Sequence, residues 1–82
     1  MSDLGQIISR IRKNKAETAV VRLVEFHGTR CVDLRAFVEG ENGEDVPTKK
    51  GLALNVALIP ELIAALQEAK VEADRQAGRA AA

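Results

Sequence analysis

The chain has 82 residues, of which 46% are hydrophobic and only two are aromatic, and its 12 acidic side chains balance 12 basic ones. This length accommodates one small domain and excludes a second. One cysteine and one histidine cannot form an internal disulfide or supply the three or four ligands of a structural zinc site. The chain has neither the apolar run of a membrane span nor a signal peptide, which predicts a soluble, cytoplasmic protein. Because a small aliphatic core is thin, we expect it to share apolar surface with a second copy.

The zero net charge is a cancellation between segments. Residues 6–38 and 46–55 together carry nine basic side chains and three acidic ones. Residues 39–45, "EGENGED", hold four acidic side chains and no basic one. If residues 6–38 and 46–55 form a sheet and residues 39–45 form the tip of a loop, the sheet is basic.

Four segments have the patterning of β-strands. Residues 6–14, "QIISRIRKN", alternate and form the first predicted strand. Residues 19–26 and 31–38 have period-2 patterning rich in β-branched side chains, and the "HGTR" between them, with Gly28 free to take a positive φ, predicts a hairpin. The Asn42-Gly43 pair predicts a second turn before residues 46–55, "VPTKKGLALN", whose Pro47 puts the start of that strand at a sheet edge or bulge.

The strand at residues 31–38 has two unlike faces. Val32, Leu34, Ala36 and Val38 share one face, which we expect to be core. Cys31, Asp33, Arg35 and Phe37 share the other, which mixes charge with an aromatic ring.

From Val56 the period changes to that of an amphipathic helix, with apolar residues at Ile59, Leu62, Ile63, Leu66 and Ala69. Asn55 is the expected N-cap. Pro60 would remove a helical hydrogen bond, so we expect either a separate first turn or a kink. The small and polar residues around Gly78 predict fraying. The expected boundaries are a flexible N-terminus over 1–5, one domain over 6–76 and a frayed tail over 77–82.

No catalytic constellation is visible. His27, Cys31 and Asp33 form a nominal nucleophile set, but a turn tip does not make a pocket that excludes water. The "TKKG" segment lacks the glycine spacing of a phosphate loop. We therefore expect no enzymatic activity, no cofactor and no metal.

The basic residues are distributed over all four predicted strands: Arg10 and Arg12 on the first, Arg22 on the second, Arg35 on the third, Lys49 and Lys50 on the fourth. With Phe26 and Phe37 available for stacking, this is the pattern of a groove for single-stranded nucleic acid. The alternative is that these charges discourage aggregation of exposed strands, while Phe37 or Phe26 belongs to the core.

The order of "EFHGTRCVDLRAFV", an acidic turn, "PTKKGLALN" and "LIPELIAALQEA" resembles the Positive Cofactor Four family of transcriptional coactivators, bacterial branch, over about residues 6–72. The resemblance implies an α+β fold in which a curved four-stranded antiparallel sheet precedes one C-terminal helix (β-β-β-β-α). It also implies a homodimer paired through its helices, whose sheets bind single-stranded DNA with little sequence preference.

Position by position, the resemblance assigns phosphate contacts to Arg35, Lys49 and Lys50 and base stacking to Phe26, with Gly51 allowing close backbone approach. Arg10 and Arg12 correspond loosely to a basic position on the family's first strand, and His27 stands where the family often has lysine. Val38 replaces a tryptophan of the eukaryotic members, which, with the neutral charge, suggests weaker binding. The predicted nucleic-acid contacts are Arg10, Arg12, Arg22, Phe26, His27, Arg35, Lys49 and Lys50, and the predicted dimer contacts are Ile59, Leu62, Ile63 and Leu66.

The leading hypothesis is therefore a non-enzymatic, homodimeric single-stranded-DNA-binding module of the cytoplasm and nucleoid, acting in transcription or DNA maintenance. Melted duplex or RNA and the transcription machinery are its further expected partners, and a membrane is not. The alternative is a dimeric protein-interaction module with the same fold, whose acidic tip at residues 39–45 docks a basic partner.

Overall fold

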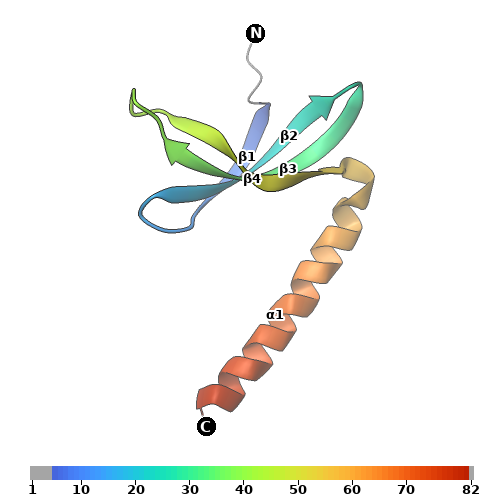
Figure 1. Cartoon of the computed structure of the whole chain (residues 1–82). Coiled ribbons are helices and arrows are strands. Elements are labelled where there is room, and N and C mark those ends of the chain that lie inside the picture. The colour runs from blue at the N-terminus through green and yellow to red at the C-terminus, as the bar shows by residue number, and fades with distance from the viewer. Residues whose placement is uncertain (1–4, 82) are drawn as a thin grey trace.

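The computed structural model describes residues 5–81, which form a four-stranded antiparallel sheet and a C-terminal helix (Figure 1). The strands are β1 (Gln6–Arg12), β2 (Glu17–Phe26), β3 (Thr29–Glu39) and β4 (Asp45–Asn55), and they lie side by side in that order. The 3-10 turn η1 (Val56–Leu58) and the helix α1 (Ile59–Ala81) follow. This confirms the predicted β-β-β-β-α order. Within the described residues, no helix is long and apolar enough to cross a membrane.

The β2–β3 connection is the predicted hairpin. Phe26 pairs with Thr29, so His27 and Gly28 form a two-residue turn, and both have positive φ, 51° and 80°. Two left-handed residues make the turn type whose twist matches the flanking strands. The hairpin therefore needs Gly28, and His27 tolerates its position better than a β-branched residue would.

Cross-strand pairs give the sheet two faces, since paired residues point to the same side. The basic face, as we call it, carries Arg10, Val20, Arg22, Asp33, Arg35 and Phe37, and the apolar face carries Val21, Leu23, Val32, Leu34 and Ala36. Arg10 on edge strand β1 contacts Asp45 on the opposite edge strand, β4. The sheet therefore curls around its basic face.

This curl changes where the deepest burial lies. Val32 and Ala36 on the apolar face are buried as predicted, but the most buried side chains, Val20, Asp33 and Phe37, are on the basic face. The prediction that only the Val32 face is core was therefore wrong. The core extends to both sides of the sheet at its centre, because the curled edge strands cover the basic face there.

The start of the helix resolves the problem posed by Pro60. The Asn55 side chain accepts a hydrogen bond of 2.8 Å from the Ala57 amide and caps η1. α1 then begins at Ile59, so Pro60 lies in its first turn, where an amide has no helical acceptor. The separate first turn is thus confirmed. α1 extends to Ala81, past the predicted start of fraying; the fraying and the other domain boundaries stay predictions, and residues 1–4 and 82 lie outside the described residues.

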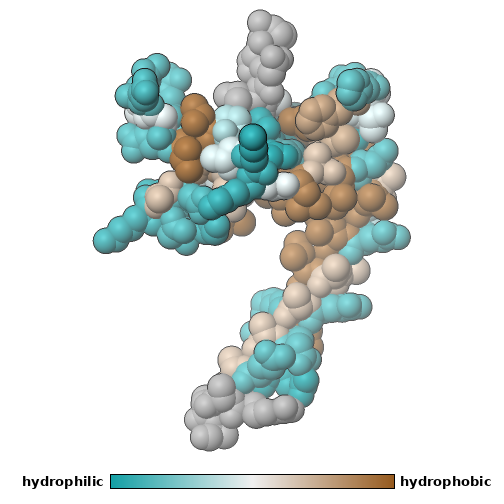
Figure 2. Space-filling model, viewed as in Figure 1, coloured by the Kyte–Doolittle hydropathy of each residue, from teal (hydrophilic) through white to brown (hydrophobic). Residues whose placement is uncertain are grey.

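α1 projects away from the sheet (Figure 1), and its main contacts within the described chain are with η1. Ile59 and Leu62 are half-buried near this junction, whereas Ile63 and Leu66 are at least half exposed. The part of the apolar stripe at Ile63 and Leu66 is therefore left largely uncovered by the described chain. In Figure 2 a hydrophobic patch at the base of the sheet continues onto the first turns of α1.

Candidate nucleic-acid interface

A buried ion-pair network lies at the centre of the basic face. The carboxylate of Asp33, 1% exposed, accepts a 2.7 Å hydrogen bond from Arg22 Nε. It also accepts bonds from Nε and Nη2 of Arg35, of which the Nη2 bond to Oδ1 is 2.8 Å long. Arg35 Nη1 donates to the Thr48 carbonyl on β4 at 3.0 Å. One carboxylate thus fixes two guanidinium groups, and the network keeps one net positive charge.

The titration behaviour of this network follows from its contacts. Burial alone would raise the pKa of Asp33, but hydrogen bonds from Arg35 and Arg22 outweigh it and hold the pKa below its ordinary value. The same hydrogen bond raises the pKa of Arg35. Asp33 and Arg35 therefore stay charged together.

The two arginines of the network, both predicted nucleic-acid contacts, differ in their exposure to solvent. Arg22 is 7% exposed, and its guanidinium lies 5.3 Å from the centre of the Phe37 ring, which is itself 1% exposed. These two side chains pack against each other and hold the basic face together. Phe37 is a core residue, so the expectation that its ring is available for stacking was wrong. Arg35 keeps 17% of its side-chain surface open to solvent.

Arg10 and Arg12 lie at the edge of the basic face. Arg10 Nη1 is 3.2 Å from Asp45 Oδ2, and Arg12 makes a long contact of 3.5 Å with the Thr18 hydroxyl. Arg12 also lines a hollow between the β1–β2 turn and the β3–β4 loop, together with Lys15. Sequence reasoning did not select Lys15, because the "NKAET" turn has no alternation that would assign it to a face.

Lys49 and Lys50 lie where the pairing register between β3 and β4 shifts, between the Arg35–Gly51 and Phe37–Pro47 pairs. Lys50 Nζ is 2.8 Å from Glu17 Oε2, and Glu17 pairs with Val38 on the apolar side of the sheet. The residues that the structure describes supply no ion-pair partner for Lys49.

Glu17 is bound by two ammonium groups. Its Oε1 atom is 2.8 Å from Lys13 Nζ, and its Oε2 atom holds Lys50. Hydrogen bonds from Lys13 and then Lys50 lower the pKa of Glu17 to about 2. Nothing in the sequence pattern marked this cluster, because Lys50 is 33 residues away along the chain.

Gly51 serves the sheet itself. A Cβ atom at this position would lie 2.3 Å from the Leu34 carbonyl oxygen and 2.7 Å from the Cα of Arg35. The close backbone approach expected at Gly51 is thus an approach to β3.

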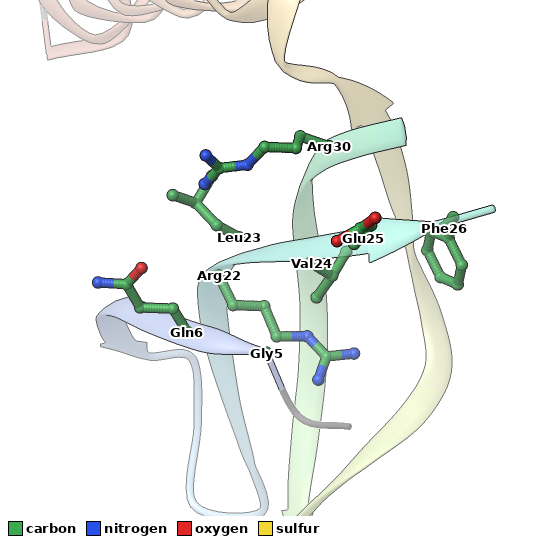
Figure 3. A pocket seen from close by; sticks show the side chains of 8 residues that line it. All are labelled: Gly5, Gln6, Arg22, Leu23, Val24, Glu25, Phe26 and Arg30. Atoms are coloured by element: carbon green, nitrogen blue, oxygen red, sulfur yellow. The ribbon is translucent and has the colours of Figure 1, made fainter. Parts of the chain in front are cut away.

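Phe26 and His27 lie at the hairpin end of the sheet, apart from the lysines. Thr29, the partner of Phe26, is six residues from Arg35 along β3, or about 20 Å at the rise of a strand. Phe26 is 50% exposed and lines a hollow of about 660 Å³ beside the end of β2, shown in Figure 3. Arg30, a cation that sequence reasoning did not select, lines the same hollow.

The described residues contain no group of three His, Cys, Asp or Glu side chains that could hold a metal ion. The groups that this surface exposes include the cations Arg10 and Lys49 and the Phe26 ring.

Comparisons with known proteins agree with this architecture. The family model described as "Transcriptional Coactivator p15 (PC4)" matches residues 13–65. The crystal structure of a PC4 homolog from Burkholderia pseudomallei, in its orthorhombic form, is 27% identical with a TM-score of 0.76, and the match covers 85% of this chain and 95% of that one. Its tetragonal form, also 27% identical, gives a TM-score of 0.74 over 80% and 97% of the two chains. No curated protein sequence matches the chain significantly.

Proposed function

The chain belongs to the transcriptional coactivator p15 (PC4) family, which is known for single-stranded DNA binding, and we propose that it binds single-stranded DNA as a homodimer. Phosphates contact cations of β1, β3 and β4, and a base stacks on Phe26. The protein acts without catalysis, in transcription or DNA maintenance.

The observation that carries this proposal is the exposure of groups that the fold does not use. Phe26 is half exposed although aliphatic residues with the same β-propensity would serve the strand. Lys49 is exposed with no carboxylate partner among the described residues, and Arg35 presents the remaining Nη1 and Nη2 donors of a fixed guanidinium. A fixed planar fork suits phosphate because its orientation is settled before binding.

The homodimer is supported by apolar surface that one copy leaves open. Ile63 and Leu66 on α1 and Leu52 on β4 are at least half exposed. Exposed aliphatic side chains that continue from a sheet onto a helix (Figure 2) are typical of a protein interface. We propose that a second copy covers this surface through Ile59, Leu62, Ile63 and Leu66.

A titration of a labelled twenty-nucleotide strand, followed by fluorescence anisotropy at low and at physiological salt, tests the proposal. Binding that weakens steeply with salt is expected, because phosphate neutralisation releases counterions. Lys49→Glu and Lys50→Glu, made separately, are expected to weaken binding and to reduce the salt dependence. Lys70→Glu on α1, where Lys70 pairs with Asp74, is the matched control.

If wild-type protein failed to bind at low salt, the proposal would be wrong. If only one lysine variant lost affinity, the other lysine would be removed from the interface. Competition with duplex DNA and with RNA at fixed salt establishes the preferred nucleic acid.

The second candidate is a dimeric protein-interaction module. The acidic residues Glu39, Glu41 and Glu44 are exposed in and beside the β3–β4 loop of a chain with zero net charge, which favours a basic protein partner. Binding of such a partner with no binding of oligonucleotide would favour this function over the first.

A further inference from the structure

Two of the proposed phosphate contacts are occupied by carboxylates of the same chain. Glu17 holds Lys50 at 2.8 Å and Asp45 holds Arg10 at 3.2 Å. Each pair joins strands that are not neighbours in the sheet, β2 with β4 and β1 with β4. Strand pairing therefore does not require these contacts.

The two cations are also free to move. The side chains of Lys50 and Arg10 are 68% and 51% exposed in their ion pairs. A long side chain at such exposure has rotamers that reach solvent, so each cation can leave its carboxylate without unpacking the core.

Glu17 keeps a partner when Lys50 leaves. Its other oxygen holds Lys13 at 2.8 Å. The carboxylate of Glu17 is thus not left unpaired, and transfer of Lys50 to an external anion costs only the Lys50 contact.

We propose that Glu17 and Asp45 are internal competitors that single-stranded DNA displaces from Lys50 and Arg10, and that they set the affinity of the interface. This inference rests on the proposed function. Ion pairs at a protein surface are weak, so removing each competitor is expected to change the affinity by a factor of roughly two to five. The chain therefore binds more weakly than its cations alone would allow.

The test measures oligonucleotide affinity at low salt for Glu17→Gln and Asp45→Asn. Each variant should bind about two- to fivefold more tightly than wild type, and the gain should shrink at physiological salt, where the ion pairs are screened. Glu68→Gln and Glu41→Gln are the matched controls, since each removes one negative charge from an exposed residue for which no ion pair is present among the described contacts. Thermal unfolding of every variant checks that the fold is kept.

A double-mutant cycle separates competition from a general charge effect. In a Lys50→Ala background, Glu17→Gln should increase the oligonucleotide affinity by no more than Glu68→Gln does. In an Arg10→Ala background, Asp45→Asn should increase it by no more than Glu41→Gln does.

The proposal is wrong if Glu17→Gln and Asp45→Asn match their controls, weaken binding, or keep their gain after the cation is removed. If wild-type protein binds the oligonucleotide but the variants give any of these results, the inference fails and the proposed function still holds. If wild type does not bind, the proposed function fails, and the inference then requires Glu17→Gln/Asp45→Asn to bind where wild type does not.

Discussion

Asp33 is the residue on which the basic face depends. It is buried with Arg22 and is bonded to both arginines of its network. Removing the charge of one partner in a buried ion pair leaves the other charge uncompensated, which costs about 3–5 kcal/mol. Asp33→Asn should lower the free energy of unfolding by that amount in urea titrations followed by circular dichroism.

Asp45→Asn is the control for Asp33→Asn, because its ion pair with Arg10 is exposed and should contribute less than about 1 kcal/mol. Equal effects of the two variants would contradict the assignment of Asp33 as a buried charge centre.

The two phenylalanines should respond in opposite ways to truncation. Phe37→Ala removes a buried ring and should cost about 3–5 kcal/mol of stability. Phe26→Ala should leave stability nearly unchanged but weaken oligonucleotide binding by about 1–3 kcal/mol, the contribution of one stacked base. Chemical denaturation and anisotropy measured on both variants check this. A Phe26→Ala variant that binds like wild type would remove Phe26 from the interface.

Glu17 should make stability depend on pH in the acid range. Its pKa is lowered from 4.5 to about 2 by Lys13 and Lys50, so its ion pairs stabilise the fold fully above the unfolded value of 4.5. This stabilisation is lost as pH falls from 4.5 to about 2. The difference in melting temperature between wild type and Glu17→Gln should therefore shrink over that range, as thermal scans would reveal. A difference that stays constant down to pH 2 would contradict the pairing.

At the scale of elements, β3 and β4 approach so closely at Gly51 that only glycine fits. Gly51→Ala places a methyl group against the Leu34 carbonyl and should destabilise the protein by roughly 1–3 kcal/mol, the usual cost of overpacking. Gly78→Ala is the contrasting control: a Cβ there meets no atom within 4 Å, and the better helix propensity should stabilise the protein by up to about 1 kcal/mol. Unfolding midpoints in urea measure both, and an unaffected Gly51→Ala would show that the strands can separate at no cost.

The elements that local signals specify could be predicted from the sequence. The turn at His27-Gly28, the cap at Asn55 and the interruption at Pro60 each depend on a few consecutive residues.

What the sequence could not predict depends on contacts between distant segments. The curl of the sheet, which buries Phe37 and Asp33, follows from how β1 and β4 meet across the basic face. The pairing of Lys50 with Glu17 likewise requires strands that are not neighbours. No periodicity within one segment carries that information, so the division of the cations into paired and unpaired ones appears only in three dimensions.

At the scale of the whole molecule, the main contacts of α1 within the described chain are with η1, and Ile63 and Leu66 of its apolar stripe are at least half exposed. A helix of this kind in water gains most of its stability from a partner surface. The sheet, in contrast, has its own buried core around Val20 and Phe37. A change on the stripe should therefore affect association before it affects the fold of the sheet.

Leu66→Asp tests this division. Leu66 is 56% exposed within one chain, so the substitution removes little intrachain packing, but in a dimer it would bury a carboxylate, which costs several kcal/mol. Light scattering should give a dimer for wild type and a monomer for Leu66→Asp, with the sheet signal in circular dichroism retained. Val71→Asp is the control, because Val71 is also exposed and lies about 140° around the helix from Leu66 at 3.6 residues per turn. Monomeric wild type, or equal effects of the two substitutions, would mean that the stripe is not the interface, and the exposed side chains of β4 would then be the surface left to pair the two copies.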